Sequence, residues 1–197
     1  VLVVNPSLNV RSVAELVGLV KAKGGTMSYG TPSVAHFNHF VTEVFNRRVG
    51  IKVPAVPYKG EAPMITDLIG GQVDYGFGFA TTVDPFVKGG LLRALATTGA
   101  SRSPQLPDVP TFIELGMPEV EMTIWTGMAG PAGLPPNIVE RLQSEVSKIL
   151  RNPAIKSRRE FADSEIVASK PEAFRVFLAA ERVRWAKLVK ETGIKVQ

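Results

Sequence analysis

The chain has 197 residues, a formal net charge of +5 at pH 7 and no cysteine. The lack of cysteine excludes disulfides, thiolate zinc sites and cysteine nucleophiles, and no stretch approaches the roughly 20 continuous apolar residues that span a bilayer. The basic residues form no stripe with interleaved aromatic residues, so nucleic acid is not an expected partner.

The chain starts on an apolar run, Val1–Asn5, that is typical of a buried strand. No initiating methionine, basic start or signal-peptide cleavage site precedes this run. We therefore expect the chain to begin inside a domain.

Short apolar runs then alternate with helical patterns as far as residue 98. Ser12-x-x-Glu15 is a capping box that predicts the start of a helix, and Gly24-Gly25 predicts its end. Strands or extended segments are expected at Val1–Asn5, Thr26–Tyr29, Pro54–Tyr58, Val73–Phe77 and Leu91–Thr98. Further helices are expected up to about Phe45, over Pro63–Ile69 and over Thr82–Val87.

The second half carries two more capping boxes, Thr111-x-x-Glu114 and Ser169-x-x-Glu172, which predict a short and a long helix. Between them, Asn137 is expected to cap a helix that runs to Leu150. A short helix is expected after Asn152-Pro153, and strands are expected at Val120–Ala129 and Glu165–Ala168.

This alternation of strands and helices, with short connections, predicts an α/β fold with a mostly parallel sheet. The elements before Met122–Gly127 are short and rich in glycine, whereas the helices after it are longer and more charged. We therefore expect a domain boundary there and two lobes.

Two strand-to-helix junctions have the composition of a ligand site, because open α/β sheets bind ligands beyond the carboxyl ends of their strands. In Tyr29–His36, glycine allows close backbone approach, Thr31 and Ser33 offer hydroxyls, and the following helix offers N–H groups. These groups suit a carboxylate or a phosphate. An ordinary capped turn is the alternative.

The second junction, Gly76–Thr82, combines small residues with the aromatic residues Phe77 and Phe79. It would bring bare backbone and one aromatic face to a crevice. A strand end that packs against a neighbouring element is the alternative.

His36, His39 and Glu43 share one helix face, which is one possible arrangement for a metal site. No HExxH motif supports it, so we expect no metal. We expect His36 to donate a hydrogen bond to a ligand and His39 to be structural. No nucleophile elbow, P-loop or dinucleotide fingerprint is present, which disfavours an enzyme.

Several stretches in a fixed order resemble the solute-binding proteins of tripartite tricarboxylate transporters, also called Bug-type or TctC-like receptors. The resemblance extends across essentially the whole chain, and the stretches that carry it are Val56–Gly60, Asp67–Asp74, Leu92–Ala96, Arg102–Thr111, Trp125–Gly127 and Pro131–Gly133.

The resemblance implies a two-lobed α/β fold related to type II periplasmic binding proteins, of the Venus flytrap kind. Residues 1–123 would form the second ligand-binding lobe, and residues 124–197 the C-terminal portion of the first lobe, whose N-terminal part the chain would lack. The family implies a periplasmic receptor, without catalysis or cofactor, that gives a small carboxylate to a membrane permease. We expect a monomer.

When the ligand-facing segments of the family are transferred to the matching positions of this chain, they are expected at Tyr29–Phe37 and Gly78–Thr81. The expected ligand-binding residues are Tyr29, Thr31, Ser33, Val34, His36, Phe37, Gly78, Phe79, Ala80 and Thr81. The family often has an acidic residue at the place of Gly78, and its absence argues against amino-acid ligands. Phe79 favours an apolar or aromatic acid over them.

Two alternatives from other classes remain open. The type II binding fold also serves as the effector-sensing domain of transcription regulators, which would carry a helix-turn-helix upstream. An enzyme on the same scaffold is the other alternative, because fold alone does not fix function.

Overall fold

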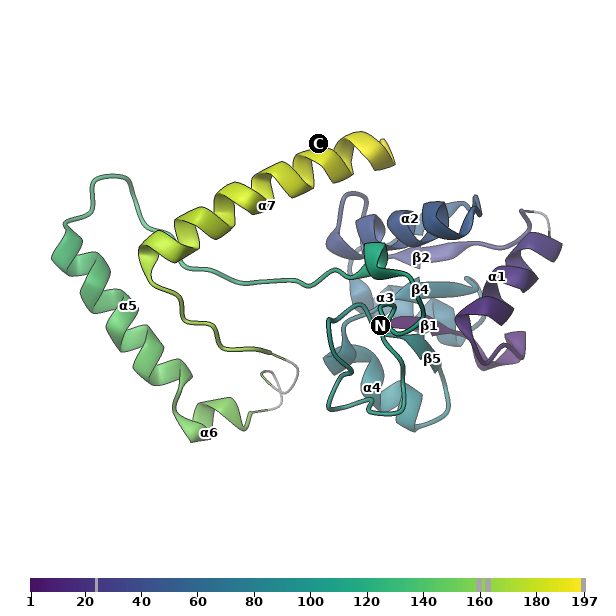
Figure 1. Ribbon diagram of the computed structural model, residues 1–197. Helices are drawn as coiled ribbons and strands as arrows, with labels where there is room; N and C mark the ends of the chain where they lie inside the picture. Colours follow the sequence, from purple (N-terminus) through teal and green to yellow (C-terminus); the bar gives the residue numbers. More distant parts are fainter. Residues whose placement is uncertain (24, 159–160, 162–163, 196–197) are drawn as a thin grey trace. The chain divides into compact units, whose positions relative to one another are not determined.

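The computed structural model describes residues 1–23, 25–158, 161 and 164–195. The chain divides into two compact units (Figure 1), and each is described here by itself. Unit 1 comprises Val1–Ile124 and Val189–Gln197, and unit 2 comprises Trp125–Leu188. The assignment of residues 1–123 and 124–197 to two different lobes stays a prediction.

Unit 1 is built on a five-stranded sheet with the strand order β3-β2-β4-β1-β5. The strands are β1 (Leu2–Val4), β2 (Tyr29–Thr31), β3 (Ala55–Pro57), β4 (Tyr75–Phe77) and β5 (Arg93–Ala96). β2 pairs in parallel with both β3 and β4, whereas β1 runs antiparallel to β4 and β5. The sheet is therefore mixed. The expected parallel order holds around β2, but hydrophobic periodicity carries no information on the direction of β1.

Four helices accompany the sheet: α1 (Val13–Ala22), α2 (Phe37–Val49), α3 (Glu61–Ile69) and α4 (Ala80–Lys88). The first capping box is confirmed, because the backbone N–H of Glu15 donates to Ser12 Oγ at 3.1 Å. The α1 helix ends at Ala22. Gly24, one of the two glycines expected to end it, lies outside the described residues.

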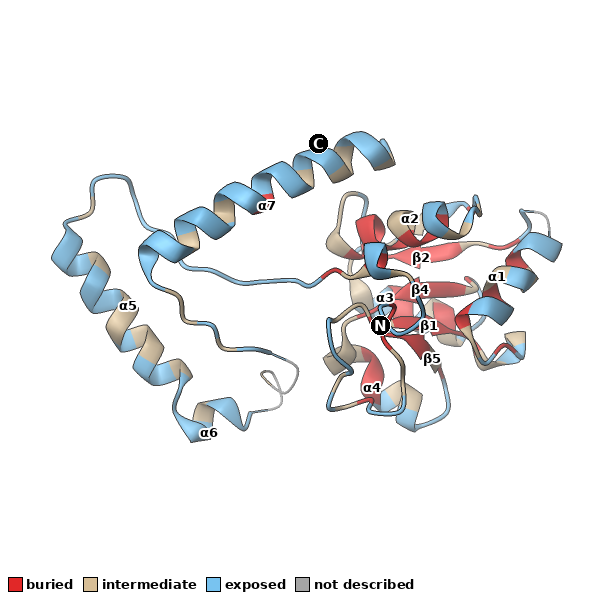
Figure 2. Ribbon diagram, in the orientation of Figure 1, coloured by how far each residue is buried: buried red, intermediate tan, exposed pale blue. Residues whose placement is uncertain are grey.

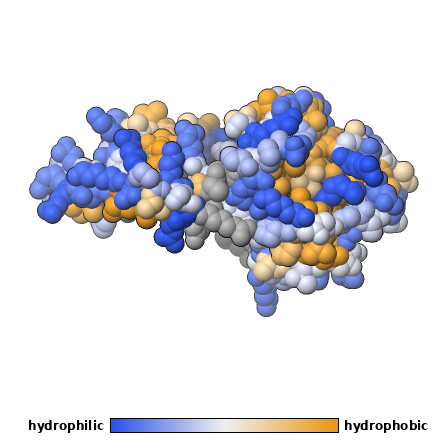
Figure 3. Space-filling model, turned by 90° about the horizontal axis from the view of Figure 1, so that it is seen from below, coloured by the Kyte–Doolittle hydropathy of each residue, from blue (hydrophilic) through white to orange (hydrophobic). Residues whose placement is uncertain are grey.

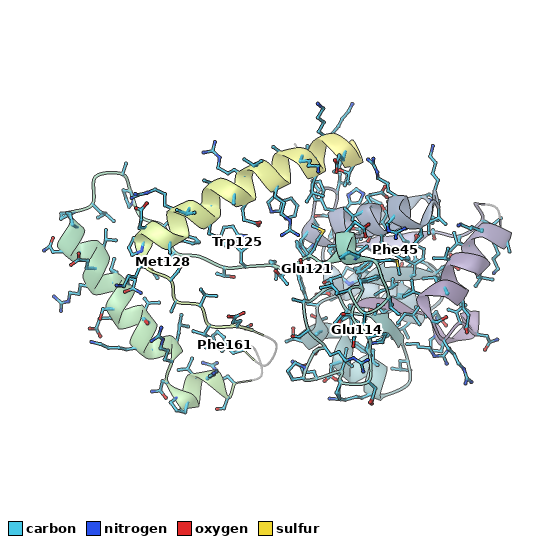
Figure 4. The ribbon with its side chains drawn as sticks, viewed as in Figure 1. Phe45, Glu114, Glu121, Trp125, Met128 and Phe161 are labelled. Atoms are coloured by element: carbon cyan, nitrogen blue, oxygen red, sulfur yellow. The ribbon has the colours of Figure 1, made fainter. Side chains whose placement is uncertain are left out.

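An aromatic cluster holds α2 against one face of the sheet. Tyr75 and Phe77 alternate with Gly76 along β4, so both aromatic side chains point to the same face. Phe45 of α2 (Figure 4) lies with its ring centroid 6.0 Å from Phe77 and 5.6 Å from Phe112. All of these side chains are at most 2% exposed.

The other face of the sheet packs against α3. Met64, Ile65 and Leu68 of α3 are buried in one cluster with Val3 and Val73. A Cβ atom placed on Gly30 of β2 would lie only 2.7 Å from Met64 Cγ. Helix α3 therefore lies directly on the bare backbone of β2, which fixes the position of its first residue, Glu61, near the end of that strand.

The second capping box forms, but it starts a single turn. The Thr111 N–H donates to Glu114 Oε2 at 2.7 Å, and the Glu114 N–H donates to Thr111 Oγ1 at 3.1 Å. Residues 112–116 form a turn instead of the expected short helix. Gly116 has a φ of 74°, which does not continue a helix.

Unit 2 contains α5 (Pro136–Leu150), α6 (Pro153–Lys156) and most of α7 (Pro171–Thr192). The expected strands at Val120–Ala129 and Glu165–Ala168 are wrong. Val120 ends a short 3-10 turn, and neither segment pairs with a strand in the described part of the chain. Apolar and β-branched residues favour a strand, but a strand also needs a hydrogen-bonding neighbour. Helix α5 begins at Pro136, so Asn137 does not cap it.

Unit 2 has a sparse interior. Figure 2 shows the buried residues concentrated in unit 1, and Glu181 is the only buried residue among those described in unit 2. Trp125 packs against Phe174 and Phe177 at ring distances of 5.7 and 5.2 Å. Figure 3 shows hydrophobic side chains at the surface of both units, between hydrophilic ones. None of the described helices is long and apolar enough to cross a membrane.

Candidate ligand-binding site

Three parallel strands end at one edge of the sheet of unit 1. The parallel register of β3, β2 and β4 brings together the segments that follow them, Tyr58–Glu61, Thr31–Phe37 and Gly78–Thr82. We call these three segments the site edge. Both junctions that the sequence singled out belong to it, in the place where open α/β sheets bind ligands.

Side-chain contacts join two segments of the site edge. The side-chain amide of Asn38, at the start of α2, donates to the Phe77 carbonyl at 2.8 Å and is 2% exposed. The rings of Phe37 and Phe79 stack at 6.4 Å, and His36 meets Phe79 edge-on at 6.2 Å. The structure therefore brings together His36, Phe37 and Phe79, three of the residues that the sequence singled out.

His39 holds the backbone of the first segment. Ala35 has a φ of 60°, in the left-handed region, and its N–H donates to His39 Nδ1 at 3.2 Å. Burial lowers the pKa of His39, against the opposing charge of Glu43. A neutral ring is the form whose Nδ1 accepts this bond. The prediction that His39 is structural is confirmed.

His36 is the N-cap residue of α2 and, like His39, uses its Nδ1 atom as a hydrogen-bond acceptor. Its Nδ1 accepts from the Asn38 backbone N–H at 3.3 Å. In a neutral imidazole the other nitrogen, Nε2, then carries the proton. This tautomer makes Nε2 a hydrogen-bond donor, which is the role that we expected of His36 toward a ligand.

The side chains of two expected ligand residues, Tyr29 and Thr31, are fully buried and do not reach the surface of the site edge. The Tyr29 hydroxyl donates to Glu43, and the Thr31 hydroxyl donates to the Ser33 carbonyl at 3.2 Å. Burial, together with Glu43, raises the pKa of Tyr29 far above its ordinary value. In this structure both side chains therefore have a structural role and stabilise the Thr31–Phe37 segment.

The other expected residues lie at different depths. Ser33 and Val34 are exposed, whereas Gly78 is buried. The half-buried ones are His36, Phe37, Phe79, Ala80 and Thr81. The site edge thus offers a hydroxyl, a histidine and two aromatic rings that are partly open to solvent, together with the backbone around them.

Glu61 was missed by sequence reasoning. Its Oε1 accepts from the Phe79 backbone N–H at 2.6 Å, and its Oε2 accepts from the Thr82 hydroxyl at 2.9 Å. It follows β3, the third parallel strand, so the strand-to-helix signal that found the other two junctions also applied to Tyr58–Glu61.

The histidine-rich helix face does not gather metal ligands. His36 caps a helix, His39 accepts from Ala35, and Glu43 accepts from Tyr29. Across the residues that the structure describes, no group of three or more histidine and acidic side chains could hold a metal ion.

Comparison with known proteins places the whole chain in one group. The sequence profile described as tripartite tricarboxylate transporter family receptor matches residues 1–194. Protein BugT of Bordetella pertussis is 34% identical over 197 residues, which are all of this chain and 60% of that protein. The UPF0065 protein in the tcbD-tcbE intergenic region of Pseudomonas sp. strain P51 is 30% identical over 192 residues, which are 97% of this chain and 57% of that protein.

Solved structures agree with this grouping. The structure of R. palustris Rpa4515 with adipate is 34% identical and superimposes with a TM-score of 0.86 over 98% of this chain and 64% of that one. The periplasmic binding protein BugD is 28% identical, with a TM-score of 0.85 over 100% of this chain and 66% of that one. The chain thus spans about 60% of the length of its curated relatives.

Proposed function

We propose that this chain, which belongs to the tripartite tricarboxylate transporter family of receptors, captures a small organic carboxylate as part of an extracytoplasmic solute-binding receptor. The single observation that carries the proposal is the site edge. Two segments with ligand-binding composition lie side by side at the carboxyl ends of parallel strands.

The polar groups of the first segment suit a carboxylate. The Ser33 hydroxyl, the Nε2 N–H of His36 and the backbone of Thr31–Phe37 lie before α2, a helix of 13 residues whose N-terminus favours negative charge. Charge-assisted hydrogen bonds to a carboxylate are among the stronger ones in proteins. We propose that this side of the site edge takes the acid group.

The aromatic residues of the site edge indicate the chemistry of the rest of the ligand. Phe37 and Phe79 stack on each other and are half-buried, so they offer an apolar surface. The proposed ligand classes are a di- or tricarboxylate and an aromatic acid. The adipate in the related Rpa4515 structure supports the carboxylate class.

The biological role follows the family. We propose that the full-length protein works as a monomer in the periplasm and gives its ligand to the membrane permease subunits of the transporter. In this role it binds and releases the ligand without turnover and without a cofactor.

Thermal unfolding of the full-length protein against paired ligands tests the proposal. The acids are succinate, adipate, citrate, benzoate and terephthalate, and each is paired with its uncharged amide. A ligand at a hundred times its Kd stabilises the folded state by about 2.7 kcal/mol. We expect an acid to raise the Tm while its amide does not.

Two variants connect the effect to the site edge. His36→Gln removes the imidazole donor and should weaken the shift, whereas Arg102→Gln breaks an exposed salt bridge to Glu114 and should leave it unchanged. No shift with any acid at concentrations well above millimolar would reject the proposal and reopen the regulator and enzyme alternatives.

A further inference from the structure

Glu61 binds the start of a neighbouring helix with both of its carboxylate oxygens. Oε1 accepts from the N–H of Phe79, the N-cap residue of α4, and Oε2 accepts from the hydroxyl of Thr82 in its first turn. Phe79 has no side-chain oxygen to cap α4 itself. An acidic residue from α3 therefore supplies the cap that the sequence of α4 lacks.

The backbone around Gly78 leaves room for this carboxylate. A Cβ atom on Gly78 would lie 3.0 Å from Glu61 Oε1 and 2.4 Å from Val83 Cγ1. Glycine at this position lets Glu61 reach the main chain at the end of β4. The negative charge consequently lies inside the second segment of the site edge, although no acidic residue occurs in Gly78–Thr82 itself.

Glu61 forms no salt bridge with a cationic group in the part of the chain that the structure describes. The nearby Asp84, by contrast, pairs with Lys88 at 2.8 Å. The positive end of the α4 dipole and the two hydrogen bonds stabilise the charge. A helix N-terminus that already holds a carboxylate has little left to attract a second one, and the two like charges repel.

We infer that Glu61 is a specificity-determining residue of the proposed site, because its charge rejects a second carboxylate of the ligand on the Gly78–Thr82 side. The inference rests on the proposed function and narrows it. The ligand presents one acid group to Thr31–Phe37 and an uncharged, apolar or aromatic end to Phe79. Of the proposed ligand classes, the aromatic acids with one carboxylate fit this arrangement, and apolar monoacids fit it as well.

Matched pairs of acids measure this effect on the full-length protein. Hexanoate and adipate have the same chain length and differ by one carboxylate, as benzoate and terephthalate do on an aromatic ring. Titration calorimetry gives the ratio of the two Kd values in each pair. For the wild-type protein we expect the diacid to bind at least about tenfold more weakly than the monoacid, since like charges brought together are strongly unfavourable.

Glu61→Gln is the decisive variant, because glutamine keeps the acceptor for the Phe79 N–H and a polar group at the Thr82 hydroxyl, while it removes the charge. We expect the diacid-to-monoacid ratio of Kd values to fall about tenfold toward unity. Asp67→Asn makes the same change of charge on the same helix, where Asp67 accepts from Tyr58, and should leave the ratio as it is.

The outcomes separate the inference from the proposed function. The role of Glu61 is overturned if Glu61→Gln leaves the diacid-to-monoacid ratio of Kd values unchanged, or if Asp67→Asn lowers it equally. In either case, binding of the monoacids still supports a carboxylate receptor. A wild-type protein that prefers the diacids overturns the inference as well. If neither member of either pair binds, both the inference and the proposed function for these acids are rejected.

Discussion

The backbone N–H of Ala35 donates a hydrogen bond to Nδ1 of His39 across 3.2 Å. This bond ties the middle of the Thr31–Phe37 segment, where Ala35 has a left-handed φ of 60°, to the first turn of α2. His39 is only 9% exposed, and its ring lies 6.2 Å from that of Tyr29. A buried histidine thus sets the backbone conformation of residues that are proposed to bind the ligand.

Replacing His39 should loosen this segment. His39→Leu fills a similar space but removes the acceptor, so the Ala35 N–H loses its partner, at a cost of about 1–3 kcal/mol in the free energy of unfolding. Denaturant unfolding measures this loss. We expect His39→Asn, which keeps an acceptor, to lose less. Equal losses in the two variants would show that the ring matters for packing alone.

The stability of unit 1 should depend on pH through His39. Burial lowers its pKa, so below about pH 6.5 the unfolded chain binds a proton that the folded chain resists. The contribution of the neutral His39 to the free energy of unfolding is therefore fully present above pH 6.5 and is lost as the pH falls below this value. The free energy of unfolding should therefore depend less steeply on pH between pH 5 and 8 in His39→Gln than in the wild-type protein. An unchanged slope in His39→Gln would contradict this account.

The three tyrosines should not ionise in the ordinary range while the protein is folded. Burial, with the Asp67 hydrogen bond, raises the pKa of Tyr58 to about 12, and burial raises the pKa of Tyr29 and Tyr75 further. Because the unfolded chain ionises near pH 10, the folded state loses stability as the pH rises above 10. Absorbance at about 295 nm, where tyrosinate absorbs, should rise together with the loss of far-ultraviolet circular dichroism. A rise near pH 10 in the folded protein would contradict this.

Two glycine substitutions should have opposite effects on stability. Gly78→Ala places a Cβ 2.4 Å from Val83 Cγ1 and should cost about 1–3 kcal/mol, as overpacked cores do. Gly18 lies inside α1 with no atom within 4 Å of such a Cβ, so Gly18→Ala should gain about 0.5–1 kcal/mol of helix propensity. Thermal unfolding of both variants checks the sign of each effect, and a stabilising Gly78→Ala would contradict the packing at the end of β4.

Most of the first 98 residues could be predicted from the sequence, because apolar runs and capping residues are local signals. Helix α1 begins after Ser12 as expected, and β4 lies within the expected Val73–Phe77. Val120–Ala129 has the composition of a strand but finds no partner in the described chain, since strand pairing depends on residues far away in the sequence. The direction of β1 was missed for the same reason.

The candidate site was predictable where it depends on neighbouring residues. His36 and Phe37 follow β2, and Phe79 follows β4, so the topology rule brings them together. Glu61 and Phe79 are 18 residues apart, and their hydrogen bond exists because Gly30 lets α3 lie against the sheet. Periodicity and motifs do not report such a contact. The burial of Tyr29 and Thr31 likewise follows from α2 covering them.

Backbone amide chemical shifts of the ¹⁵N-labelled full-length protein, titrated with benzoate and hexanoate, test the central claim most directly. If the carboxylate binds at the site edge, the largest shifts occur at Ser33–Phe37 and at Phe79–Thr82, and His36→Gln weakens them. Saturable shifts that occur instead along α1 or α5, with the site edge unchanged, would contradict the proposed site.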